Sequence, residues 1–190
     1  MHCASKGETM THHTRFAVAS LVCAVLAGCA QQTTPDIKTG SGEKHDMQLM
    51  PAGNATCLST SSSQNSHGAA VTNAVRRNAG LSAVQPNPVL AQVAARHACD
   101  MAQRGRMTHK GSRTSGPGPR VKAAGYAPMV TAENIAAGPF SQERVLAEWN
   151  ASGGHLANML IPQVRDYGIG QAIGPDGKTR FWAAVYAAPR

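Results

Sequence analysis

The apolar positions of this chain follow a helical pattern in its middle and form strand-like runs near its C-terminal end. Helical spacing from about residue 66 predicts a helix that closes near Gly80, because glycine is a common C-terminal cap. Asn87-Pro88 predicts the start of a second helix, since proline is favoured in the first turn. The inward stripe of that helix ends before Gly105 and consists of Leu90, Val93, Ala94, His97 and Met101.

The pattern changes after this helical region. Residues 110–128 are dense in Gly and Pro and indicate a loop. Ser141 is expected to cap a third helix that runs to about Ala151. Two β-prone runs, 167–173 and 180–186, flank a Gly-Pro-Asp-Gly turn and predict an antiparallel hairpin. Helices followed by a hairpin indicate an α+β fold, with helices packed on a small antiparallel sheet.

The N-terminal region has the pattern of an export signal. Residues 16–28 are apolar apart from one serine and follow a basic stretch, which is typical of a signal peptide and too short to span a bilayer. Leu26-Ala27-Gly28-Cys29 resembles a bacterial lipobox, so we expect Cys29 to be lipidated. The expected organisation is a signal peptide over 1–28, a flexible polar tether over 29–65 and a folded domain over 66–190. Ordinary secretion and an uncleaved anchor are the alternatives.

Cysteine usage agrees with export. Removal of the signal peptide takes away Cys3 and Cys23, and lipidation uses Cys29, which leaves Cys57 and Cys99. In an oxidising compartment this pair predicts one disulfide, which would stabilise the fold by about 4 kcal/mol in the chain-entropy treatment. Two free thiols are the alternative.

The net charge of +8 does not by itself indicate a nucleic-acid partner. The 18 Lys and Arg residues are scattered along the chain, whereas nucleic-acid binding requires a clustered basic face with interleaved aromatic residues. We therefore expect a basic solvated surface, no nucleic-acid partner and a monomer.

An ordered set of motifs resembles the bacterial branch of the CAP superfamily, which groups cysteine-rich secretory proteins, antigen 5 and pathogenesis-related 1 proteins. The resemblance covers about residues 66–188 and implies an α-β-α sandwich. Its motifs are Asn73-x-x-Arg76, Gly80-Leu81, Asn87-Pro88-x-Leu90, Met107-Thr108-His109, Ala132-Glu133-Asn134-Ile135-Ala136, Trp149, Gly154-His155-x-x-Asn158-x-Leu160 and Gly168-x-Gly170.

The resemblance also implies a cleft with a His-Glu-Glu-His tetrad that binds Zn²⁺ or a similar ion in some members of the superfamily. His109, Glu133 and His155 resemble three tetrad positions, whereas the fourth position is Ser152 in place of glutamate. Two histidines and a carboxylate with a water molecule would suit a catalytic zinc ion. The alternative is a structural cluster in which Glu133 accepts hydrogen bonds from His109 or from backbone amides. A buried core role is expected for His97.

Three classes of function follow from this reading. The favoured one is a lipid-anchored binding module at the cell envelope, facing the periplasm or the cell surface, with an envelope protein, a peptidoglycan fragment or a lipid as its ligand. The second is a metal-dependent hydrolase of peptide or ester bonds that uses His109, Glu133 and His155. The third is lipid or sterol carriage. A fold does not decide among them, because function belongs to the site.

Overall fold

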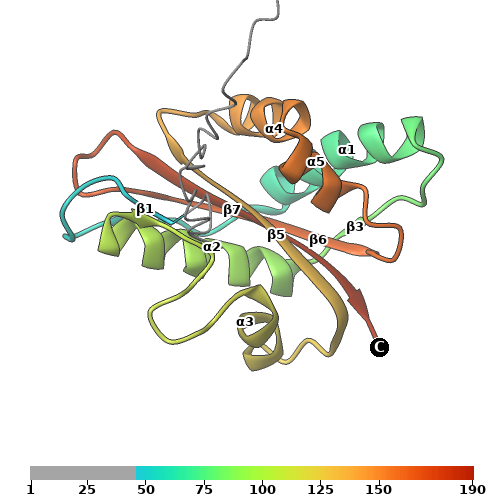
Figure 1. Ribbon diagram of the computed structural model, residues 1–190, viewed down its shortest axis with the longest axis horizontal. Coiled ribbons are helices and arrows are strands. Elements are labelled where there is room, and N and C mark those ends of the chain that lie inside the picture. Colours follow the sequence, from blue (N-terminus) through green and yellow to red (C-terminus); the bar gives the residue numbers. More distant parts are fainter. Residues whose placement is uncertain (1–45) are drawn as a thin grey trace, which may run out of the picture. The chain divides into compact units, whose positions relative to one another are not determined.

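The computed structural model describes residues 46–190 (Figure 1). The expected signal peptide, the lipidation site Cys29 and the first part of the expected tether lie outside the described residues. No helix within residues 46–190 is long and apolar enough to cross a membrane.

The main sheet has five strands, and its longest strands are antiparallel. The order is β2 (Thr56–Cys57), β6 (Asp166–Ile173), β7 (Arg180–Pro189) and β5 (Pro128–Gly138), and β3 (Gln85–Pro86) pairs in parallel with β6. Strands β6 and β7 form the hairpin expected from the two β-prone runs. A separate pair joins β1 (Met47–Gln48) to β4 (Arg106–Met107).

The helices begin and end at recognisable caps. Helix α1 (Ser62–Asn78) is capped by Ser61, and α2 (Pro88–Arg104) is capped by Asn87 and ends at Gly105 in the left-handed conformation. Helix α4 (Gln142–Ala151) starts at the expected cap Ser141. Two short helices complete the set, α3 (Pro117–Ala123) and α5 (Gly153–Met159).

The sheet lies between two layers of helices, as Figure 1 shows. One core joins α1, α4 and α5 to side chains of β7 that include Trp182, Ala184 and Tyr186. The other core joins α2 and α3 to the alternate side chains Phe181, Ala183 and Val185. This alternation follows from the period of two along a strand, and it buries both faces of β7. The fold is therefore the expected α-β-α sandwich.

Two glycines allow α2 to approach the sheet closely. A Cβ atom on Gly168 would lie 2.1 Å from the backbone nitrogen of Ala91, and one on Gly170 would lie 2.2 Å from that of Ala95. Any side chain at these positions would push the helix away from β6. The Gly168-x-Gly170 motif therefore serves close helix–sheet packing.

The structure differs from the sequence-based prediction in three places. Residues 128–138 form β5, where no strand was predicted, because Ala, Glu, Asn and Gly outnumber the β-branched Val130, Thr131 and Ile135. The segment expected to be a loop contains α3, which begins at a proline. The folded domain also extends N-terminally of the predicted boundary at residue 66, since β1 and β2 pair with β4 and β6 through backbone hydrogen bonds that leave no apolar pattern.

The disulfide expected between Cys57 and Cys99 is present. It joins β2 to α2 across 42 residues, with a distance of 5.1 Å between the two Cα atoms. It therefore anchors the polar N-terminal segment to the core helix.

Candidate functional site: a buried glutamate cluster

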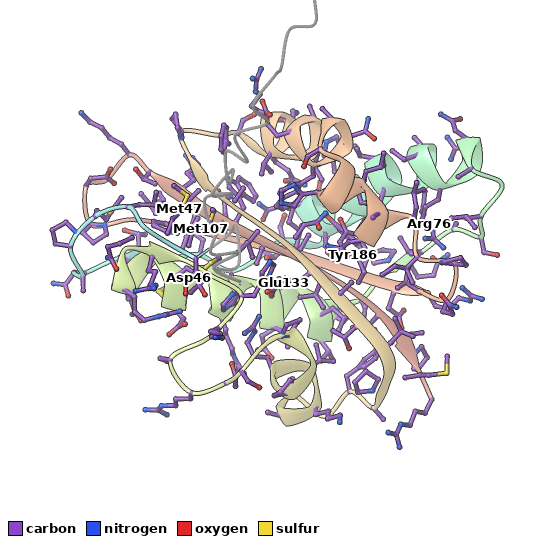
Figure 2. All side chains as sticks on the ribbon, viewed as in Figure 1. Asp46, Met47, Arg76, Met107, Glu133 and Tyr186 are labelled. Atoms are coloured by element: carbon purple, nitrogen blue, oxygen red, sulfur yellow. A yellow bond between two sulfur atoms is a disulfide. The ribbon has the colours of Figure 1, made fainter. Side chains whose placement is uncertain are left out.

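The alternation of side chains along β5 divides the candidate site residues between two faces of the sheet. Glu133 and Ile135 share a face, and Ile135 belongs to the core beneath α2 and α3. Asn134 points the other way and donates a hydrogen bond from Nδ2 to the backbone oxygen of His155 in α5, at 3.0 Å. Figure 2 labels Glu133 at the centre of the structure, near α2.

Glu133 is the centre of a buried cluster of charged and polar groups. Its side chain is 1% exposed. His109 donates from Nδ1 to Oε1 at 2.9 Å, and Arg120 donates from Nη2 to Oε2 at 2.6 Å. A third group, His97 on α2, has its Nε2 atom 3.6 Å from Oε1. Both carboxylate oxygens are thus engaged by cationic or hydrogen-bonding partners.

The partners keep Glu133 ionised in spite of its burial. Burial raises the pKa of this carboxyl, but the hydrogen bond from His109 and the charge and hydrogen bond of Arg120 outweigh it and hold the pKa below its ordinary value. A buried carboxylate with fixed partners is a poor general base, because a base needs a pKa near the working pH.

His97 is in the opposite situation. It is 1% exposed, and its Nε2 donates to the backbone oxygen of Thr108 at 2.9 Å. Burial lowers the pKa of this imidazole to about 4, although the charge of Glu133 acts in the other direction. The ring is therefore neutral at pH 7. The expected buried core role of His97 is confirmed, with the added finding that it lies beside Glu133.

Arg120 is the member of the cluster that sequence reasoning does not identify. It lies on α3 and also donates from Nη1 to the backbone oxygen of His109 at 2.9 Å, so that it fixes the His109 segment as well as Glu133. The Gly- and Pro-rich composition around it indicates a loop and hides the short helix. A Pro-x-Pro-Arg sequence at a helix start is the signal that could have drawn attention to it.

His155 and Ser152 lie together on the α5 side of the sheet. The Nδ1 atom of His155 is 2.9 Å from the hydroxyl of Ser152, and its ring is tilted against that of Trp149 with 6.4 Å between centroids. Trp149 is buried and donates from Nε1 to the backbone oxygen of Ile135, so it is part of the core. Asn158 links this helix to the backbone oxygen of Glu133 at 3.1 Å.

The residues around Glu133 are not arranged as the zinc site that the resemblance implies. Within residues 46–190, no group of three or more His, Cys, Asp or Glu side chains is arranged to hold a metal ion. The cation beside Glu133 is the Arg120 guanidinium, which opposes a divalent ion at the same place. The described arrangement therefore does not fit zinc, and a zinc site at His109, Glu133 and His155 stays a prediction.

The cavities described for residues 46–190 lie elsewhere. One, of about 710 Å³, lies between residues 57–66 and α2 beside the disulfide. A second, of about 620 Å³, lies between α2, residues 111–114 and α3, and includes His97 and Arg120 in its lining. A third and smaller cavity is lined by Trp182 and Gln142, among others. His109, Glu133 and His155 line none of these three.

The chain is similar to known proteins in both sequence and fold. The uncharacterized protein YkwD of Bacillus subtilis is 31% identical over 100 residues, which are 53% of this chain and 39% of that protein. An SCP-domain extracellular protein of Bacillus anthracis is similar in structure at a TM-score of 0.59 and 23% identity, over 66% of this chain and 40% of that one. An outer surface protein of Borrelia burgdorferi is similar at a TM-score of 0.61 and 16% identity, over 73% and 99%.

This chain spans only about two fifths of the length of the two Bacillus proteins. The family comparison instead covers most of the folded domain, since residues 69–186 match the cysteine-rich secretory protein family. That match extends over more than half of the chain and includes the whole Glu133 cluster. The chain belongs to the cysteine-rich secretory protein family, CAP.

Proposed function

We propose that this protein is an extracytoplasmic binding module that holds a ligand or partner at the cell envelope, and that its Glu133 cluster is a scaffold for that role. The cluster fixes three separate segments, namely α2, the His109 segment and α3, against the edge strand β5. The surface that this scaffold supports is the region around His109, whose side chain is 23% exposed.

The observation that carries the proposal is the double engagement of the Glu133 carboxylate. A hydrolase that used Glu133 would need it as a base or as a metal ligand, and both roles require an oxygen atom that can take a proton or a metal ion. Here one oxygen is bound by His109 and the other by Arg120. The carboxylate is thus used to position His109 and Arg120.

The test compares binding and turnover in the same variants. Envelope extract is passed over the immobilised wild-type chain, His109→Ala and the control His67→Ala, which removes an exposed histidine on α1. We expect the wild type and the control to bind a component of the extract in a saturable way. His109→Ala should not bind it. Hydrolysis of peptide or ester substrates by the wild type that His109→Ala abolishes would contradict the proposal.

The lipid anchor is part of the same proposal. Its support is the lipobox-like sequence that ends at Cys29, together with the disulfide of the folded domain, which is typical of exported proteins. Cys29→Ser should move the protein from the membrane fraction to the soluble fraction. Retention of an uncut chain in the membrane would show that this anchor is not used.

One contact favours hydrolysis as a second candidate function. The hydroxyl of Ser152 lies 2.9 Å from Nδ1 of His155, which is within the distance that a serine nucleophile and its base require. Ser152→Ala should abolish ester turnover if this pair reacts, and His109→Ala should leave it intact. No turnover above the Ser152→Ala level would leave the pair as a contact that orders the start of α5.

Lipid or sterol carriage, the third class, stays a prediction. Saturable binding of a fluorescent fatty acid that His109→Ala leaves unchanged would support it.

A further inference from the structure

The N-terminal arm, residues 46–60, lies against the C-terminal end of α2 and is held there with little burial. None of the residues 46–60 is buried. Its half-buried residues are Met50, Ala55, Leu58 and Thr60. Segments with few buried apolar contacts are the first to open in a folded protein. The arm therefore depends on its polar contacts and on the Cys57–Cys99 disulfide to stay in place.

Backbone hydrogen bonds join the arm to the end of α2. The amide of Leu49 donates to the carbonyl of Gly105 at 2.9 Å, and the amide of Gly53 donates to the carbonyl of Gln103 at 2.9 Å. Carbonyls at the C-terminus of a helix have no partner within the helix, so they bind side chains, other segments or water. Water can therefore replace the arm at these carbonyls while α2 stays intact.

The disulfide is the covalent contact of the arm, and solvent reaches it. Cys57 is exposed and Cys99 is half-buried. Both cysteines line the cavity of about 710 Å³ between residues 57–66 and α2, which gives an incoming thiol room beside the bond. Access is one of the properties that separate reactive from inert cysteines, and exposed disulfides are the ones opened in regulation.

The arm also supports the segment that carries His109. Strand β1 of the arm pairs with β4, with Met47 opposite Met107, and Figure 2 shows these two methionines side by side. His109 follows β4 in the sequence by two residues. The core holds the same segment independently, because Nε2 of His97 donates to the carbonyl of Thr108 at 2.9 Å. Loss of the arm would therefore loosen the His109 segment without releasing it.

We propose that the Cys57–Cys99 disulfide is a site of thiol–disulfide exchange that controls whether the arm is docked. With the bond closed, the arm orders β4 and the surface around His109. With the bond open, the arm detaches and this surface loses order. A regulatory consequence for ligand binding rests on the proposed function of the His109 surface, whereas release of the arm does not depend on it.

The reductant is a dithiol of the cell envelope, such as a protein with a Cys-x-x-Cys pair. One of its thiolates attacks Sγ of Cys57, forms a mixed disulfide and displaces Cys99 as a thiolate. The second thiolate of the reductant attacks the reductant's own sulfur in the mixed disulfide and displaces Cys57 as a thiolate. Two electrons thus pass from the dithiol, which becomes a disulfide, to the Cys57–Cys99 bond. The two cysteine thiolates take up the two protons that the dithiol loses.

The test follows amide hydrogen exchange of the labelled full chain before and after reduction by dithiothreitol, which is itself a dithiol. Cys3, Cys23 and Cys29 are replaced by serine, so that Cys57 and Cys99 are the remaining cysteines. Alkylation and mass spectrometry establish that both are reduced.

The amides of the arm and of the core should respond differently to reduction. We expect the amides of Leu49 and Gly53 to exchange at least about tenfold faster in the reduced chain, because their hydrogen bonds to the end of α2 open. The amides of residues 181–186 in β7 should keep their protection, since these residues are buried. The ring resonances of His109 should move on reduction. Those of His67, an exposed histidine on α1, are the matched control and should not move.

A variant separates the disulfide from other effects of the reductant. The chain that carries both Cys57→Ser and Cys99→Ser should show fast exchange of the arm amides without reductant, and dithiothreitol should not change it further. Reoxidation of the reduced parent chain by oxidised glutathione should restore slow exchange. This reversal tests the same claim without a substitution at either position.

Four results would overturn the proposal. They are unchanged exchange of the Leu49 and Gly53 amides after both cysteines are alkylated; loss of protection in residues 181–186 together with the arm, which would make the disulfide a staple of the whole fold; reduction that occurs only in a chain unfolded by urea; and ring resonances of His109 that do not respond. These measurements need no ligand. Failure of the oxidised chain to capture an envelope component would therefore contradict the proposed function alone.

Discussion

Arg76 and Glu133 are both buried charged side chains, and the chain compensates their charges in different ways. Arg76 is 0% exposed, and its guanidinium donates to backbone oxygens of Ser82, Met159, Ile161 and Val164 at 2.7–3.4 Å. Glu133 is held by the side chains of His109 and Arg120. Figure 2 shows the two residues in separate parts of the structure, with Arg76 beside α1.

The kind of partner decides whether a buried charge serves only the fold or can also serve a function. Backbone oxygens cannot titrate or be exchanged, so Arg76 holds the end of α1 to residues 159–164 under all conditions in which the chain is folded. The partners of Glu133 are side chains, which can titrate, move and be replaced. The Glu133 cluster is therefore the part of the molecule whose properties can respond to pH or to a ligand.

The largest effect is expected from removal of the Arg76 charge. Arg76→Met leaves four backbone oxygens without their donor and should lower the free energy of unfolding by about 3–5 kcal/mol. Urea unfolding measures the change. Arg77→Met, at the exposed neighbouring position, should stay within about 0.5 kcal/mol of the wild type. Equal losses in both variants would contradict the structural role of Arg76.

A second substitution tests the ion pair of Glu133. Arg120→Met leaves a buried carboxylate with one partner fewer and should cost about 3 kcal/mol. Adding Glu133→Gln removes the unpaired charge, so the double variant should recover part of this loss in a double-mutant cycle. Additive losses in the cycle would show that the two groups do not interact.

Acid should destabilise the protein through His97. The unfolded chain takes up a proton near the ordinary histidine pKa of about 6.5, whereas the folded chain does so only at about 4. The contribution of His97 to the free energy of unfolding is therefore fully present above about pH 6.5. It falls by up to about 3 kcal/mol as the pH drops to 4. Protonation of Glu133, whose pKa is lowered, adds to the loss at still lower pH. His97→Asn should flatten the pH dependence between 6.5 and 4; an unchanged slope would contradict this assignment.

The smallest effect is expected at His109. This side chain is only partly buried, and it contributes one hydrogen bond to Glu133 that Arg120 supports independently. His109→Ala should therefore lower the free energy of unfolding by about 1 kcal/mol. A loss as large as that of Arg120→Met would place His109 among the structural residues.

The sequence predicts the parts of this fold that have local signals. The caps Asn87 and Ser141, the helical stripe of α2, the turn of the hairpin and the cysteine pair are each visible without the structure. Strand β5 was missed, because half of the residues in its ladder to β7 are Ala, Asn or Glu, and the strand owes its stability to tertiary pairing.

The candidate site was predicted in part, for similar reasons. The proximity of His109 and Glu133 follows from the family resemblance and is confirmed. Arg120 was missed, because nothing in a Gly- and Pro-rich segment indicates that one of its arginines reaches a buried carboxylate. The division of Glu133 and Asn134 between two faces of the sheet depends on β5, so it could not be predicted without that strand.

The central claim is that Glu133 is a scaffold group whose charge Arg120 neutralises. Calorimetric titration of the full wild-type chain and of its His109→Ala variant with zinc tests this claim most directly. If Arg120 occupies the place of a cation, the wild type and His109→Ala should give the same heats, with any zinc taken up by other histidines of the chain. One-to-one binding at micromolar or tighter affinity that His109→Ala abolishes would contradict the account. It would show that His109 and Glu133 leave their present partners to form a metal centre.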